Sequence, residues 1–208
     1  MTQQIQTHIR QIEDLLPASG TAGRFVLGID GLSRSGKTTL ADALKRRLSE
    51  RGDSCVLLHI DDYITERRLR YGTGRGEGFE YYRLQWDAEQ LERSLFAGLK
   101  TAPLLTLPRY DGDSDCSLDE PILLPEHGII LIEGVFLQRS QWREYYDAVV
   151  YLDCLRERRF ERESESARRQ RFKFVNRYWK GEELYLEAER PAERADLVLD
   201  AESSLGTS

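Results

Sequence analysis

The chain has 208 residues, of which 40% are hydrophobic and 32% charged, enough to bury the core of one domain and short for two. Its formal charge of −6 argues against a protein devoted to nucleic acid or to an anionic membrane, because either partner requires a basic excess. No apolar run approaches the roughly 20 residues of a membrane-spanning helix, and the N-terminus shows no signal-peptide core. The three cysteines lie far apart, in neither disulfide nor zinc spacing, which favours a reducing cytoplasm.

The first residues predict an amphipathic helix, because Ile5, Ile9, Ile12 and Leu16 recur at helical spacing. Pro17 and the glycines that follow it end this helix and form a short linker. We therefore divide the chain into an N-terminal helix with its linker (1–20) and a single domain (21–208).

Short apolar runs then alternate with helical segments. The runs are at 25–29, 55–60, 129–132, 148–152 and 195–199, and they are typical of strands buried on both faces of a parallel sheet. Leu40, Leu44 and Leu48 mark one helix, and Asp87 is the predicted N-cap of another, with Gln90 at the capping-box position. We expect a long charged helix over about 155–178, a further helical segment up to Pro191, and two short strands around a polar turn within 104–124. The alternation predicts an α/β fold with helices on both faces of an open sheet.

Residues 31–38, GLSRSGKT, match the phosphate-loop pattern G-x-x-x-x-G-K-[ST] at every fixed position. The motif follows the first buried run and opens a helix, where backbone N–H groups and the helix dipole bind anions. In such loops the lysine reaches the β and γ phosphates and the hydroxyl that follows binds Mg²⁺. We predict a nucleoside triphosphate site formed by Gly31, Ser33, Ser35, Gly36, Lys37, Thr38 and Thr39.

Two carboxylates are candidates for the chemistry. The chain lacks the guanine-reading N-K-x-D pattern, which favours ATP, and its length favours a small kinase over a mechanical ATPase. Asp61 follows the second run, at the strand end where α/β sheets bind ligands, and could accept the proton of an attacking alcohol and orient a metal. Glu133 follows the third run and could hold Mg²⁺. The alternatives are that Asp61 and Asp62 only cap a helical turn and that Glu133 is a solvated strand end.

The segment from Arg156 to Lys173 carries eight lysines and arginines against four glutamates. We interpret it as a mobile lid, over about 155–175, that closes over the triphosphate and excludes water. For any single arginine, an ordinary solvated helix surface is an equal alternative.

The order of these motifs resembles the uridine kinase-like group of small P-loop kinases, which includes uridine–cytidine, nicotinamide riboside and pantothenate kinases and phosphoribulokinase. The resemblance covers about residues 22–200 and rests on GIDGLSRSGKTTLADAL, HIDDY, LPRYD, IILIEG and AVVYLDCLRERRFERE. It implies a P-loop NTPase fold with a five-stranded parallel sheet, flanking helices, a lid and a small β-hairpin. It also implies residue roles: Asp61 as catalytic base, Lys37 on phosphate, Thr38 and Glu133 at the magnesium site, Arg158 and Arg162 as lid arginines on ATP, and Tyr110 and Asp111 near the acceptor.

The sequence departs from that group where uridine–cytidine kinases read the pyrimidine. An aromatic residue and a histidine are expected after the P-x-Y-D motif, but the chain has Gly112 and Asp115 at about these positions. Tyr81, Tyr82 and Arg83 could line a sugar or base pocket, with core packing of the tyrosines as the alternative. The glycine-rich segment 71–79 is either a flexible substrate loop or a plain solvent loop.

We therefore predict an ATP- and Mg²⁺-dependent kinase that phosphorylates a hydroxyl of a small metabolite, most simply a nucleoside. Catalysis is assigned to Asp61, Lys37, Arg158 and Arg162, acceptor binding to Asp61, Tyr110, Asp111, Tyr82 and Arg83, and metal binding to Thr38, Glu133 and Asp61. The alternatives are a regulatory ATPase that acts through a protein partner, and a kinase for pantothenate or a sugar phosphate. We expect no nucleic-acid or membrane partner, and a homo-oligomer is left open.

Overall fold

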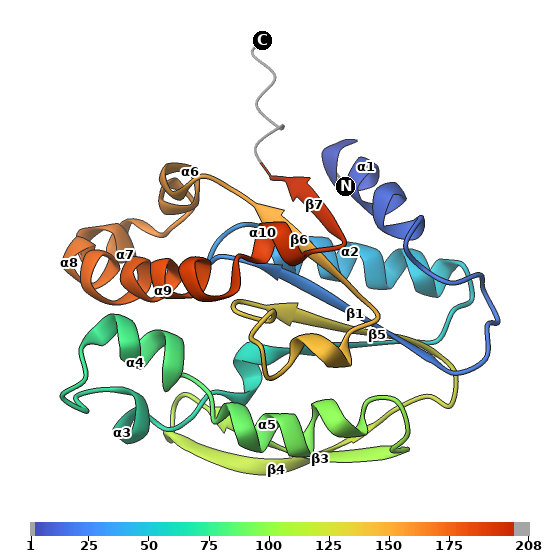
Figure 1. Cartoon of the computed structure of the whole chain (residues 1–208), viewed down its shortest axis with the longest axis horizontal. Helices are drawn as coiled ribbons and strands as arrows, with labels where there is room; N and C mark the ends of the chain where they lie inside the picture. Colours follow the sequence, from blue (N-terminus) through green and yellow to red (C-terminus); the bar gives the residue numbers. More distant parts are fainter. Residues whose placement is uncertain (1–2, 202–208) are drawn as a thin grey trace.

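A computed structural model describes residues 3–201 of the chain. At its centre is a five-stranded sheet with the order β2-β5-β1-β6-β7 (Figure 1). Every neighbouring pair in this sheet is parallel. The strands are β1 (Arg24–Gly31), β2 (Cys55–His59), β5 (Gly128–Gly134), β6 (Ala148–Asp153) and β7 (Leu197–Asp200). All five predicted runs are therefore strands, and the α/β prediction is confirmed.

Both faces of the sheet are covered, because successive side chains of each strand point to opposite sides. Leu27 and Ile29 of β1 share one core with helices α1 (Gln3–Glu13) and α2 (Lys37–Glu50). Val26, from the same strand, belongs to the other core, with residues of α4 (Glu77–Arg83), α5 (Ala88–Ser94) and α9 (Trp179–Glu189). Ile9 and Ile12 of the predicted N-terminal helix are buried in the first core.

A separate antiparallel hairpin, β3 (Leu104–Asp111) and β4 (Cys116–Leu123), confirms the two strands predicted around a polar turn. It lies beside α5 (Figure 1), and Leu105 and Leu107 enter the same core as Leu91 of that helix. Asp87 caps α5 as predicted, since its Oδ1 accepts from the Gln90 N–H at 2.9 Å. The remaining short helices are η1 (Ile60–Tyr63), α3 (Arg67–Arg70), η2 (Phe96–Gly98), η3 (Arg143–Tyr145) and α10 (Pro191–Arg194).

The single long helix predicted over 155–178 is wrong. The segment forms α6 (Arg156–Glu161), α7 (Glu165–Arg169), α8 (Arg171–Lys173) and a π-helical turn, η4 (Phe174–Tyr178), before α9 begins. Ser164 causes the first break, because its hydroxyl accepts from the Ala167 N–H and starts a new helix. Gln170 causes the second, since its ψ of 39° is not helical.

The topology places the candidate residues at one edge. Strand order reverses direction at β1, with β2 and β5 on one side and β6 and β7 on the other, and ligands of open α/β sheets bind outside such a switch point. The phosphate loop follows the carboxyl end of β1, and Asp61 follows that of β2. Glu133 lies at the carboxyl end of β5. Within residues 3–201, no helix is both long and apolar enough to cross a bilayer.

Candidate active site

The phosphate loop joins β1 to α2. Gly36 has φ of 106°, a left-handed conformation that glycine adopts without strain, and it directly precedes the first helical residue, Lys37. No side chain caps α2, so the first backbone N–H groups of a 14-residue helix are free to bind an anion. The Lys37 ammonium donates to the Leu32 carbonyl at 2.9 Å. Burial lowers the pKa of Lys37, and the nearby Glu133 and Asp61 carboxylates oppose that shift.

Strand pairing brings Thr38, Glu133 and His59 together. The register of β2 and β5 sets His59 beside Glu133, and the His59 Nδ1 lies 2.6 Å from Glu133 Oε1. The same carboxylate oxygen accepts from the Thr38 hydroxyl at 3.2 Å. The hydrogen bond between His59 and Glu133 raises the pKa of His59. The sequence did not single out His59, because its role depends on a strand register that brings it beside Glu133, a residue 74 positions away in the chain.

These oxygen donors fit Mg²⁺. Residues 3–201 contain no cluster of three histidine, cysteine or carboxylate side chains that could enclose a metal on their own. Mg²⁺ bound to a nucleotide needs no such cluster, since one or two protein oxygens, phosphates and water complete its shell. Thr38 and Glu133 supply that kind of donor set.

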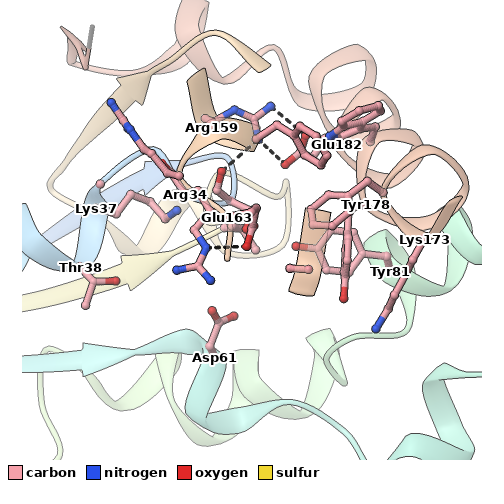
Figure 2. A pocket seen from close by; sticks show the side chains of 18 of the residues that line it. Arg34, Lys37, Thr38, Asp61, Tyr81, Arg159, Glu163, Lys173, Tyr178 and Glu182 are labelled. Carbon is pink, nitrogen blue, oxygen red and sulfur yellow. Dashed lines mark hydrogen bonds and ion pairs between the residues drawn. The ribbon is translucent and has the colours of Figure 1, made fainter. Parts of the chain in front are cut away.

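Asp61 is the second residue of η1, which directly follows β2, and its carboxylate lies across the cavity from Lys37 (Figure 2). The carboxylate faces the cavity, but protein surrounds it on the other sides; this burial raises its pKa, against the opposing effect of the Lys37 cation. A carboxylate with a raised pKa is a stronger base than an ordinary aspartate. Asp62 points elsewhere, toward Arg109, with 3.7 Å between the charged atoms.

A cavity of about 820 Å³ joins these groups. Five of the seven residues predicted to bind nucleotide line it: Ser33, Gly36, Lys37, Thr38 and Thr39. The other two lie behind the loop. Gly31 approaches β6 so closely that a Cβ there would be 2.8 Å from the Leu152 carbonyl, and Ser35 is buried. They shape the loop and do not face the cavity.

Residues of the predicted lid contact the phosphate loop. Arg162 donates to the carbonyls of Arg34 and Ser35, each at 3.0 Å, and Arg34 pairs with Glu163 at 3.1 Å (Figure 2). Arg162 thus lines the cavity. This part of the segment holds its position through backbone carbonyls and one ion pair.

Arg158, predicted to meet ATP, is absent from the cavity lining. Its side chain is exposed and pairs with Glu161 on the surface of α6. The neighbouring residue, Arg159, lines the cavity instead, because successive side chains of a helix point about 100° apart. Arg159 binds both oxygens of Glu182 at 2.7 and 2.9 Å and donates to the Ser33 carbonyl at 3.0 Å (Figure 2).

Two acceptor residues predicted on the hairpin, Tyr110 and Asp111, also lie outside the cavity lining. The Tyr110 hydroxyl donates to Asp115 at 2.8 Å, inside the hairpin. Asp111 accepts from the Ser114 hydroxyl and from two backbone N–H groups of the turn, which lowers its pKa. Both residues stabilise the hairpin turn.

The predictions for Tyr82 and Arg83 are corrected in the same way. Tyr82 is buried in the core and donates to Glu189 at 3.1 Å, while Arg83 is exposed and lies over the Tyr82 ring. The adjacent Tyr81 lines the cavity instead, together with Tyr178 from η4. Their rings meet edge to face, with centroids 5.0 Å apart.

The sheet, the phosphate loop and the carboxylates beside it define a P-loop kinase fold. The family model described as "AAA domain" matches residues 27–196, most of the chain, which therefore belongs to that family. A solved structure from Bacillus stearothermophilus, described as a possible uridine kinase, is 49% identical, with a TM-score of 0.80 over 95% of this chain and 97% of that one. The chain belongs to the uridine kinase-like group of P-loop kinases.

Curated relatives agree with this grouping. The uridine kinase of Staphylococcus aureus (strain JH9) is 28% identical over 158 residues, 74% of this chain and 75% of that protein. The uridine kinase of Leuconostoc citreum (strain KM20) is 29% identical over 149 residues, 68% of this chain and 67% of that protein. D-glycerate 3-kinase from Cryptococcus neoformans var. grubii, 13% identical with a TM-score of 0.55 over 98% of this chain and 96% of that one, shares the fold alone.

Proposed function

We propose that this protein is an ATP-dependent kinase that transfers the γ-phosphoryl group to a hydroxyl of a small metabolite. The observation that carries the proposal is the position of Asp61, across one cavity from the phosphate loop and Lys37. A protein that only binds and hydrolyses nucleotide has no need of a base that faces an acceptor alcohol. Membership of the uridine kinase-like group supports the same reaction class.

The mechanism assigns each step to a residue. The free N–H groups of the loop and of α2 bind the β and γ phosphates, and Lys37 exchanges the Leu32 carbonyl for a phosphate oxygen. Mg²⁺, held by Thr38 and Glu133, would neutralise phosphate charge when bound. The acceptor oxygen attacks the γ phosphorus in line, the bond to the β–γ bridging oxygen breaks, and the acceptor proton goes to Asp61.

We further propose that the segment 156–173 acts as the lid. Arg162 already lies against the loop that would hold the triphosphate, and Arg34 pairs with Glu163 across the same opening. Closure would bring guanidinium groups to the charge that develops on the leaving oxygens and would exclude water, which competes with the alcohol for the phosphoryl group.

The test is acceptor-dependent release of ADP by the purified full-length chain. A panel of nucleosides, sugars, sugar phosphates and hydroxy acids should contain compounds that raise ADP release far above the rate with ATP alone, with one phosphorylated product per ADP by mass spectrometry. A nucleoside is the acceptor predicted from the sequence, and the relatives described as uridine kinases support including it. ADP release that no hydroxyl compound raises would contradict the proposal and favour the regulatory ATPase.

Glu133→Gln should weaken Mg²⁺ binding by about tenfold to a hundredfold, the usual cost of altering a metal site. The substitution keeps the size of the side chain and removes its charge. Calorimetric titration of Mg²⁺ into the protein saturated with a non-hydrolysable ATP analogue measures the effect without turnover. Glu126→Gln, at an exposed position outside the cavity, is the control. Equal Mg²⁺ affinity in the wild type and Glu133→Gln would remove Glu133 from the metal site.

A further inference from the structure

One end of the cavity carries a positive charge, the Lys173 ammonium, that has no role in the proposed phosphoryl transfer. In Figure 2 Lys37 and Thr38 lie at one end, Asp61 lies between, and Lys173 lies at the other end with Tyr81 and Tyr178. Asp61 and Lys173 therefore face the same cavity, with Lys173 at the end away from the phosphate loop. The side chains at this end indicate which chemical class of acceptor the cavity binds. This inference rests on the proposed kinase function.

The other cations of the cavity lining all have partners. They are Arg34 with Glu163, Arg159 with Glu182, Arg162 with two loop carbonyls and Lys37 with the Leu32 carbonyl. For Lys173 no carboxylate or carbonyl partner of the ammonium is found within residues 3–201. Its ammonium lies over the faces of Tyr178 and Tyr71, 5.4 and 5.9 Å from the ring centroids. Ring faces attract a cation and orient it, but they do not neutralise it.

The π-helical turn explains why Lys173 faces the cavity. Lys173 and Tyr178 are five residues apart, and in an α-helix their side chains would diverge by about 140°. The wider η4 turn between them brings both to the cavity lining, while Arg177 is absent from that lining, lies over the Tyr71 ring and pairs with buried Glu80 at 3.2 Å. π-helical turns of this kind occur frequently at functional sites. The π-helical turn thus places one cation, Lys173, and one aromatic ring, Tyr178, on the same wall of the cavity.

The chain that borders this wall is also basic. Residues 66–83 contain five arginines and three glutamates, one of which, Glu66, pairs with Arg68, although the whole chain has a net charge of −6. Tyr71 of this segment contacts Lys173, so the segment and the cavity end are adjacent. A positive field at this opening would raise the local concentration of anions.

We propose that the acceptor is a hydroxy compound that also carries an anionic group, either a carboxylate or a phosphate, and that Lys173 binds this group. The hydroxyl would lie at Asp61, the carbon skeleton against Tyr81 and Tyr178, and the anion at the Lys173 ammonium. Such an acceptor supplies the counter-charge that Lys173 lacks.

The test uses acceptors in pairs that differ only in the anionic group. D-glycerate with glycerol and D-pantothenate with panthenol test a carboxylate; D-ribulose 5-phosphate with D-ribulose tests a phosphate; uridine represents a neutral nucleoside. We expect an anionic member to have the higher kcat/KM, and Lys173→Met to lower its kcat/KM by about tenfold to a hundredfold, the contribution of a charged hydrogen bond. Lys173→Arg should retain most of the preference.

Lys180→Met is the matched control, because Lys180 is exposed on α9 and lies outside this cavity. Efficient transfer to uridine or another neutral acceptor, with no gain from an anionic group, would overturn the inference and leave the proposed function standing. An anion preference that survives in Lys173→Met would overturn the assignment to Lys173. If no member of the panel raises ADP release, the proposed function fails and this inference fails with it.

Discussion

Asp61→Asn is expected to lower kcat by about a thousandfold, within the range that a general base contributes, while the Kd for ATP stays nearly unchanged. The amide keeps the size of the side chain but cannot take the proton of the acceptor hydroxyl. ATP affinity should persist because the phosphate loop, α2 and Lys37 do not depend on this proton transfer. Single-turnover transfer and equilibrium binding of an ATP analogue measure the two quantities separately.

Asp62→Asn is the matched control for this variant. Asp62 is the next residue and has the same chemistry, but it points to Arg109 and is absent from the cavity lining. It should retain nearly full activity. If Asp61→Asn and Asp62→Asn transferred phosphoryl groups equally well, Asp61 would not be the base, and proton transfer would have to occur directly to phosphate or solvent.

The pH profile follows from the direction of the Asp61 shift. Burial raises the pKa of Asp61, so the carboxylate takes up a proton at a higher pH than an ordinary aspartate. Only the deprotonated form can act as base, and activity is therefore lost as pH falls through this raised pKa. The acid limb of kcat/KM should lie above the usual aspartate value of about 4. A limb at or below that value would contradict a base whose pKa is raised.

The parts of the fold that could be predicted from the sequence are those set by local patterns. The five apolar runs and the GLSRSGKT motif fixed the strands, the loop and the edge of the sheet where Asp61 and Glu133 lie, because parallel strands share a direction. The errors at Arg158 and Tyr82 are each one residue from the side chain that lines the cavity. One residue in a helix is a rotation of about 100°, and helices as short as α4 and α6 have too few turns for periodicity to define a face.

The contacts of Lys173 and His59 could not be predicted for a different reason. They arise from the π turn and from a strand register, and both depend on distant parts of the chain. The hairpin shows the opposite case. Tyr110 and Asp111 match a family motif, but local hydrogen bonds to Asp115 and Ser114 hold them in the turn. A motif identifies residue types, whereas tertiary contacts decide whether they reach the site.

Glu182→Gln should destabilise the protein by about 3–5 kcal/mol, because it leaves the buried Arg159 cation without its counter-charge. The side chains of Arg159 and Glu182 are only 6% and 1% exposed, so water cannot replace the lost partner. For a chain of this size that corresponds to a fall in Tm of about 10 °C. Urea unfolding followed by circular dichroism gives the free energy, and thermal unfolding gives the Tm.

Helix α6, which carries Arg159, supplies the control for this prediction. Glu161→Gln removes an exposed partner of Arg158 and should change stability by less than about 0.5 kcal/mol. The double variant Arg159→Met with Glu182→Leu should recover much of the stability, since it removes both buried charges together. Equal stability of Glu182→Gln and Glu161→Gln would show that α6 and α9 do not enclose this ion pair in solution. Because Arg159 also donates to the Ser33 carbonyl, loss of this contact should weaken ATP binding together with stability.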